Sequence, residues 1–432
     1  MKKKYAIIGL GARHNMYLSA ICKTYREKCE IALVSDINEG RIEKAKMQAK
    51  EWAGYEPEGC HPKELISRMT ALSVSELIVT TIDSFHDEYI CMALENGFDV
   101  ITEKPMTIDE KKCKRILETQ KKTGRKVRVT FNYRYAPVRS QVKELLMTGI
   151  IGDILSVDFH WMLNLSHGAD YFRRWHRWKK NSGGLMVHKA THHFDLVNWW
   201  LNTVPERVFA SGDRKFYRPE TAGFYGLKNR SERCLDCPEK KKCNFYFDLN
   251  KTASLRELYL KNEKFDGYFR DRCVFSSDMD IEDCMNVIVD YKNGTKMSYS
   301  LNAFVSWEGY IISFNGTRGR LEHKCEESVY TSGDESVQGA LRPEGTWIKI
   351  YPNWKPAYSV EIKKSEGGHG GGDPIMLSDI FEPEKQSEDK LKRAADHRSG
   401  AWSILTGIAA NHSMKKHIPI KIEELVDNLE LP

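Results

Sequence analysis

The sequence predicts an α/β protein with a doubly wound parallel sheet, followed by an α+β domain with a large, mainly antiparallel sheet. Three observations carry this prediction. Strand and helix patterns alternate over about 130 residues, an early apolar run leads into a Gly-x-Gly turn, and closely spaced strand patterns replace the alternation further on. We therefore expect a Rossmann domain at 1–130 and a second domain at 131–432, with a cysteine-containing insertion at about 214–280.

The first strand and turn indicate a dinucleotide site. The strand enters Gly9-Leu-Gly11, followed by Ala12 and Arg13, and a second apolar run ends at Asp36. In a βαβ unit the first glycine permits the tight turn, the second lets the backbone approach a pyrophosphate, and an acidic residue after the second strand binds a ribose. His14 replaces the third glycine of this pattern. Because Asp36 would repel a 2′-phosphate, NAD is favoured over NADP.

The next elements carry polar residues where each predicted strand ends. Helices are expected at 39–52, 62–69, 87–96 and 108–123, and strands at 76–81, 99–104 and 127–131. Ligands of doubly wound sheets lie beyond the carboxyl ends of the strands. We therefore predict that further cofactor-binding residues are Thr80, Thr81, His86, Glu103, Lys104 and Asn132.

Beyond Asn132, strand patterns recur at 154–161, 206–211, 283–291, 296–303 and 310–315. Asn293-Gly294 predicts a hairpin turn between two of these strands. A late apolar helix is expected at 398–415.

The segment after Gly183-Gly184 gathers imidazoles. His188, His192 and Asp195 stand at steps of four and three residues, which would put them on one face of a helix. Histidine is a mediocre helix former and the side chain that most readily exchanges a proton near neutral pH. This favours an acid–base site, with ordinary polar residues on a packed helix as the alternative.

Composition excludes several classes of protein. The 66 basic and 60 acidic residues are interspersed, which is no nucleic-acid footprint, and no apolar run approaches the roughly 20 residues that cross a bilayer. Eleven cysteines, odd in number and scattered, favour a reduced cytoplasmic protein.

One group of cysteines has metal-ligand spacing. Cys234 and Cys237 form a Cys-x2-Cys pair, and Cys243 and Cys273 follow. Four thiolates can hold tetrahedral zinc, so a structural metal is predicted for this insertion. Cys284 competes for the fourth position, and free thiols, disulfides or an iron–sulfur cluster are the alternatives.

Together these motifs resemble the glucose-fructose oxidoreductase / inositol dehydrogenase (Gfo/Idh/MocA) family. Glu103-Lys104-Pro105 matches its Glu-Lys-Pro signature, which implies that Lys104 reaches the nicotinamide and the substrate. His192 takes the place of the family's catalytic histidine, while His188 stands where many members have aspartate. The resemblance implies catalytic roles for Lys104, His192 and His188. The residues expected to bind substrate are Tyr133, Arg134, Trp175, His188, His193 and His369.

A second, shorter resemblance lies in Gly367 to Asp373, which is similar to a glycine-histidine loop of the family's NAD-dependent α-N-acetylgalactosaminidase branch. The expected function is NAD-dependent oxidation or reduction of a secondary hydroxyl in a small-molecule carbohydrate: a sugar, polyol or glycoside. The alternatives are a glycosidase or lyase working through transient C3 oxidation and elimination, and a non-catalytic NAD-binding regulator. The resemblance also implies a homo-oligomer, a dimer or tetramer.

Overall fold

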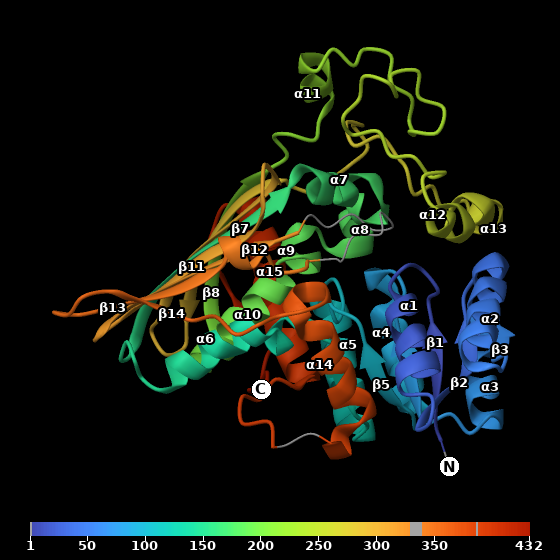
Figure 1. The fold of residues 1–432 in the computed structure, drawn as a ribbon, viewed down its shortest axis with the longest axis horizontal. Helices are drawn as coiled ribbons and strands as arrows, with labels where there is room; N and C mark the ends of the chain where they lie inside the picture. The colour runs from blue at the N-terminus through green and yellow to red at the C-terminus, as the bar shows by residue number, and fades with distance from the viewer. Residues whose placement is uncertain (1, 329–338, 386–387) are drawn as a thin grey trace.

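The computed structural model describes residues 2–328, 339–385 and 388–432. Two sheets organise the chain, one of seven strands and one of nine (Figure 1). The seven-stranded sheet has the order β15-β6-β5-β4-β1-β2-β3, and the nine-stranded sheet the order β14-β13-β12-β11-β7-β10-β9-β8-β16. The predicted succession of a doubly wound sheet and a second sheet is confirmed.

The first sheet is parallel over its first six strands. These strands are β1 (Lys3–Ile8), β2 (Cys29–Ser35), β3 (Glu58–Cys60), β4 (Glu76–Val79), β5 (Asp99–Thr102) and β6 (Val127–Val129). The helices between them are α1 (His14–Ser19), α2 (Glu39–Ala53), α3 (Leu65–Ala71), α4 (His86–Glu95) and α5 (Glu110–Thr123). The strand order reverses between β1 and β4, and such a switch point opens a crevice at the carboxyl ends of the strands.

Local sequence explains where α2 and α5 begin and end. The side chains of Asn38 and Asp109 accept hydrogen bonds from the backbone amides of Arg41 and Lys112, which caps the first turn. The chain then leaves each helix through a glycine in the left-handed conformation, at Gly54 and Gly124.

The second sheet is mainly antiparallel, as predicted, with one parallel pair between β7 and β10. Its strands are β7 (Ile154–Asn164), β8 (Pro205–Asp213), β9 (Cys284–Tyr291), β10 (Lys296–Val305), β11 (Glu308–Gly316), β12 (Gly319–Glu327), β13 (Trp347–Pro352), β14 (Tyr358–Val360) and β16 (Ile420–Lys421). Gly294, with φ of 89°, makes the predicted turn between β9 and β10.

Helices cover one face of this sheet (Figure 1). They are α6 (Pro137–Met147), α10 (Thr191–Leu201) and α15 (His397–Lys416), the last being the predicted late helix. Val157, Phe159 and Trp161 of β7 are fully buried on the covered side, so this interface is the main core of the second domain.

Two segments late in the chain pack against the first domain. The expected domain boundary at residue 130 assigns both segments to the second domain only. β15 (Ala395–Asp396) pairs antiparallel with β6. Helix α14 (Gly368–Phe381) adds Phe381 to the core around Tyr5, whose rings lie 5.3 Å apart at their centroids. The chain therefore joins the two domains more than once.

Between β8 and β9 the chain makes an excursion containing α11 (Pro219–Phe224), α12 (Ala253–Leu258) and α13 (Glu263–Asp266). We call residues 214–280 the insertion. Its outer part has a small core of its own, formed by Cys234, Phe247, Leu249, Leu255, Leu258 and Tyr259. In Figure 1, α12 and α13 lie directly above α2 of the first domain. No helix in the described part of the chain is long and apolar enough to cross a membrane.

Candidate active site

A cavity of about 530 Å³ opens at the carboxyl ends of the parallel strands, between the two domains. The predicted site residues that line it are Gly9, Gly11, Ala12, Arg13, Asp36, Thr80, Thr81, His86, Glu103, Lys104, Asn132, Tyr133, Trp175, His188, His192 and His369. Cavities of this size with a few convergent polar groups are typical of small-molecule and cofactor sites.

The glycine turn after β1 has the geometry that a dinucleotide requires. Gly9 has φ of +88°, and a side chain there would meet the Thr81 backbone at 2.6 Å. A side chain on Gly11 would meet nothing within 4 Å, so the backbone of Gly11 faces open space in the cavity wall. Thr80 ties β4 to this turn, since its hydroxyl donates to the Gly9 carbonyl at 2.6 Å.

Asp36 stands at the end of β2, beside the glycine turn. Its two oxygens accept hydrogen bonds from the backbone amides of Leu10, at 2.6 Å, and Asn38, at 2.9 Å. These bonds fix the carboxylate on the cavity wall, and a carboxylate has further acceptor positions for a ribose diol. His14, in place of the third glycine, is buried, and burial lowers its pKa to about 4.

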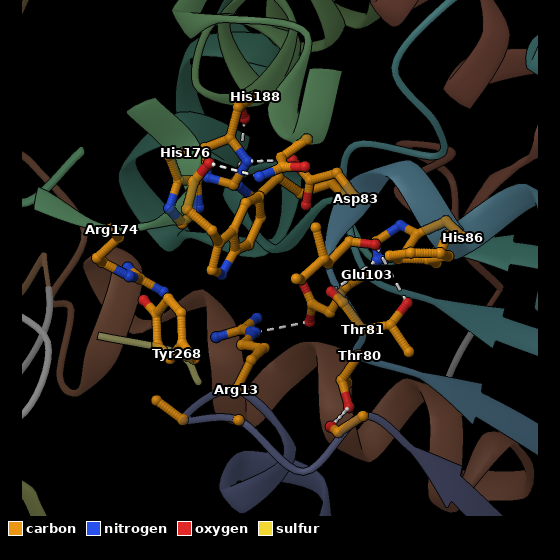
Figure 2. A pocket seen from close by; sticks show the side chains of 18 of the residues that line it. Arg13, Thr80, Thr81, Asp83, His86, Glu103, Arg174, His176, His188 and Tyr268 are labelled. Atoms are coloured by element: carbon orange, nitrogen blue, oxygen red, sulfur yellow. Dashed lines mark hydrogen bonds and ion pairs between the residues drawn. The ribbon is translucent and has the colours of Figure 1, made fainter. Parts of the chain in front are cut away.

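Positive side chains surround the middle of the cavity. Arg13 comes from the glycine turn, Arg174 follows α7 (Leu165–Arg173), and Arg272 comes from the insertion. Figure 2 shows Arg13 and Arg174 on two sides of the same space. Arg13 is held by Glu103, with Nε and Oε1 2.7 Å apart. This distribution suits the phosphates of a dinucleotide.

Two further predicted residues, His86 and Asn132, line the cavity beyond β4 and β6. His86 contacts the carbonyl oxygens of Pro105, at 2.8 Å, and Thr81, at 3.2 Å, so it ties the β4 and β5 loops together. Asn132 donates from Nδ2 to Asp373 at 2.7 Å, while its buried Oδ1 has no hydrogen-bond partner among the described residues. An unpaired buried acceptor in a side chain that lines a cavity is suited to a ligand's donor. The residues present therefore fit NAD.

Lys104 and His188 meet across the domain boundary. The Lys104 Nζ lies 3.5 Å from Nε2 of His188 and donates to the His188 carbonyl at 3.2 Å. The other imidazole nitrogen, Nδ1, lies 2.5 Å from Oδ2 of Asp83, which points toward His188 in Figure 2. Burial lowers the pKa of Lys104 to about 8 and that of His188 well below its usual value, while it raises the pKa of Asp83.

The three residues predicted on one helix face lie on two helices. His188 is the last residue of α9 (Leu185–His188), whereas His192 and Asp195 belong to α10. The helical conformation is interrupted between these two helices. His192 stacks on the Tyr133 ring at 4.1 Å, and its buried Nδ1 has no partner among the described residues. Burial lowers the pKa of His192 well below its usual value, so the imidazole is neutral and able to accept a proton.

The structure does not bring Arg134 and His193 to the cavity wall, and this corrects the expectation that they contact substrate. Arg134 makes a two-pronged ion pair with Asp195, at 2.8 and 2.6 Å, in the buried interface of α10. His193 is fully buried, stacks on Trp161 at 3.8 Å and contacts the Tyr299 hydroxyl at 2.7 Å. Since adjacent helix positions lie about 100° apart, His193 faces the sheet while His192 faces the cavity.

Several cavity residues escaped sequence reasoning. They are Asp83, His167, Tyr171, Arg174, His176, Lys189, Tyr268 and Arg272. Lys189 donates to the Tyr133 hydroxyl at 3.2 Å, and His167 contacts Glu308 at 2.8 Å and Tyr171 at 3.0 Å. Lys189 adjoins His188 in sequence, Asp83 lies between Thr81 and His86, and Arg174 and His176 flank Trp175, so a signal was available for these four. Tyr268 and Arg272 reach the site from the insertion, through contacts distant in sequence. His369 lines the cavity, as expected, and contacts Asp373 at 2.7 Å.

The cysteines of the insertion are free thiols. Cys234, Cys237, Cys243 and Cys273 line one small cavity, but among the described residues no group of three or more His, Cys, Asp or Glu side chains is arranged to hold a metal ion. Burial raises the pKa of the Cys234 thiol to about 11 and also raises the pKa of the Cys243 thiol. Backbone hydrogen bonds from Phe247 to Cys234 and from Phe245 to Cys243 lower these pKa values in part. The structure therefore brings the four thiols to one cavity without a metal-binding arrangement in the described part of the chain, and the zinc expectation stays a prediction.

A dinucleotide turn in a parallel sheet, with lysine and histidine from two domains beside it, defines a nucleotide-dependent oxidoreductase of two domains. The chain belongs to the Gfo/Idh/MocA oxidoreductase family. Residues 3–131 match its "NAD-binding Rossmann fold" domain, and residues 143–422 match its "C-terminal alpha/beta domain".

Similar proteins agree with this assignment. "Putative oxidoreductase YteT" of Bacillus subtilis is 35% identical over 435 residues, covering 98% of each chain. Inositol 2-dehydrogenase of Klebsiella pneumoniae strain 342 is 23% identical, over 72% of this chain and 91% of its own. An Agrobacterium radiobacter oxidoreductase solved with NAD+, L-tartaric acid and magnesium shares the fold, with a TM-score of 0.65 at 13% identity, over 99% and 100% of the two chains.

Proposed function

We propose that this oxidoreductase uses NAD to oxidise or reduce a secondary hydroxyl of a sugar, polyol or glycoside. One observation supports this above all: Lys104 of the first domain and His188 and His192 of the second line the same cavity, beyond the glycine turn and Asp36. Curated relatives named inositol 2-dehydrogenase support a polyol or sugar as the substrate class.

The chain supplies the proton chemistry that such an oxidation needs. NAD, when bound, accepts the electron pair that leaves the substrate carbon with its hydrogen. Gly9, Gly11, Arg13 and Asp36 would hold its phosphates and a ribose. His192 takes the proton of the substrate hydroxyl as general base, and the Lys104 ammonium stabilises the oxygen as negative charge develops on it.

Aromatic and polar groups line the substrate end of the cavity. Tyr133 and Trp175 present rings suited to the apolar faces of a sugar, and Trp175 is kept in place by stacking on His176 at 3.6 Å. His188, His369 and Lys189 surround them with groups able to bond hydroxyls.

The test is a screen of sugars, polyols and glycosides with the NAD-loaded protein, followed by identification of the products. A ketose or keto-sugar product supports the proposed oxidation. Cleavage of a glycoside without accumulation of NADH would instead support the glycosidase alternative. An inactive protein whose biological effect survives Lys104→Ala would support the regulator alternative.

Asp83 is expected to position His188 rather than contact the substrate. Asp83→Asn replaces a carboxylate acceptor with a neutral amide, and hydrogen bonds to charged groups contribute about 1.5–3 kcal/mol, so we expect kcat to fall about 10–100-fold. The KM for substrate should change little, and the pH profile of kcat should shift with the pKa of His188.

The matched control is Asp87→Asn. Asp87 is also buried, but it pairs with Lys112 at 2.7 Å on the far side of α4 and does not line the cavity. Its variant should lose thermal stability and keep its pH profile. Identical profiles for the wild type and Asp83→Asn would remove Asp83 from the mechanism.

A structural zinc in the insertion stays a prediction, supported by the shared cavity of the four thiols. We expect one zinc per chain in protein produced with zinc, measured by elemental mass spectrometry, because thiolates are preferred zinc ligands. Cys243→Ser should lose the metal and Cys284→Ser, outside that cavity, should keep it. Metal-free wild-type protein with all four thiols titratable would contradict the prediction.

The expected dimer or tetramer also stays a prediction. The uncovered face of the second sheet exposes Phe209 and Ile288, which are register partners on β8 and β9. Native mass spectrometry would measure the oligomeric state directly.

A further inference from the structure

The insertion reaches over the end of the cavity where Asp36 lies. Six of its residues line the cavity together with the glycine turn: Tyr259, Asp266, Gly267, Tyr268, Phe269 and Arg272. In Figure 2, Tyr268 lies beside Arg174 and faces the same space as Arg13. The nucleotide-binding wall therefore has a second side, built from a segment more than 200 residues later in the chain.

The insertion is fastened to α2 of the first domain by polar contacts. Arg41 pairs with Asp266 at 2.8 Å, and both side chains are at most 10% exposed. Asn38 donates from Nδ2 to the carbonyl of Asn262 at 3.0 Å. These partners belong to the loop and helix that follow Asp36, so the contacts lie next to the residue assigned to the ribose.

Packing leaves little room between the two segments. A side chain on Gly40 would meet Asn262 Oδ1 at 1.9 Å, so a larger residue there would have to displace the Asn262 side chain. Ala12 of the glycine turn packs against the small core of the insertion. On the opposite side, the buried Arg270 pairs with Asp170 of α7 at 2.6 Å, which anchors the insertion to the second domain as well.

We propose that the insertion completes the dinucleotide site and holds NAD as a resident cofactor that is not exchanged between turnovers. Separation of the insertion from α2 would open this wall for the nucleotide to leave, and it breaks the buried Arg41–Asp266 ion pair and exposes both charges. Closure of both sides slows dissociation, because a pre-organised enclosed site affects the off-rate more than the on-rate.

One consequence rests on the proposed function. If bound NAD does not leave, the hydride (one proton with two electrons) that it would take from a substrate alcohol would have to pass to a carbonyl compound admitted to the same cavity. The proton lost by the first hydroxyl would be balanced by the proton taken up as that carbonyl becomes an alcohol, so a carbonyl compound would be the oxidant of the cycle.

The experiment measures exchange of the nucleotide directly. Protein loaded with adenine-labelled NAD+ is mixed with excess unlabelled NAD+, and the bound label is followed with time. For the wild type we expect a half-time much longer than one turnover. Asp266→Asn should shorten it tenfold or more, because the ion pair with Arg41 is lost.

The matched control is Glu257→Gln, the same chemical change on α12. Glu257 pairs with Lys261 at 2.8 Å on the solvent side, with 38% of its side chain exposed, and does not line the cavity. Its exchange rate should equal that of the wild type. Wild-type exchange as fast as turnover, or equal rates for Asp266→Asn and Glu257→Gln, would overturn the proposal. Because exchange is measured without substrate, this result is independent of the sugar screen.

Discussion

His192→Ala is expected to lower kcat by about 10²–10⁴-fold, the usual contribution of a positioned general base. Burial keeps the imidazole neutral, and its Nδ1 has no partner among the described residues, so nothing else in the site occupies this nitrogen. The Kd for NAD+, measured by fluorescence titration, should change less than threefold, because other residues form the walls assigned to the phosphates and ribose. Added imidazole should restore part of the lost turnover.

The control is its sequence neighbour. His193→Gln removes a buried imidazole that contacts Tyr299 and Trp161 rather than the cavity. It should lower the melting temperature and leave kcat within a few-fold of the wild type. Parallel losses of kcat and NAD+ affinity in His192→Ala, without rescue by imidazole, would contradict the assigned role.

The nucleotide end of the site could be predicted from sequence because its residues follow strands. In a parallel sheet, carboxyl ends meet at one edge, so Gly9, Asp36, Thr80 and Glu103 could be brought together without any knowledge of tertiary contacts. The same rule located Asn132. Local periodicity was enough for this part of the site because it locates the strand ends, and the geometry of the sheet brings those ends together.

The histidine segment shows where periodicity is insufficient. Steps of four and three residues predicted that His188, His192 and Asp195 share one face of one helix. The helix instead ends at His188, and a new helix carries the other two residues. Asp195 pairs with Arg134. A buried guanidinium is costly unless it is paired with a carboxylate. Tertiary packing buries Arg134, so Asp195 pairs with Arg134 instead of lining the cavity with the histidines.

The parts of the site that sequence reasoning missed depend on contacts distant along the chain. Asp83 and His188 are 105 residues apart, and Arg41 and Asp266 come from different domains. Neither pair has a local pattern that would reveal its partner. The insertion was recognised by its cysteines, yet its contribution to the nucleotide wall could be seen only in the folded chain.

Lys104→Met is expected to lower kcat about 10²–10³-fold below pH 8, where the wild-type amine is charged, which is the cost of removing a donor aimed at a developing oxyanion. The pH dependence of the wild type gives a sharper test. Burial lowers the pKa of Lys104 to about 8, from the usual value of lysine above 10. The group is therefore a cation below pH 8 and loses its charge as the pH rises through that value. If the ammonium stabilises the oxygen, wild-type kcat for alcohol oxidation falls above pH 8, approaching tenfold per pH unit.

Lys104→Arg separates charge from proton transfer, because a guanidinium stays protonated far above this range. Its different shape should lower kcat at pH 7, but the decline above pH 8 should disappear. An increase of wild-type kcat through pH 8, abolished in Lys104→Arg, would mean that the neutral amine of Lys104 accepts the substrate proton. His192 would then have to be reassigned to substrate binding. Under that assignment His192→Ala should cause only a modest loss of kcat. The two variants therefore test together which group is the base.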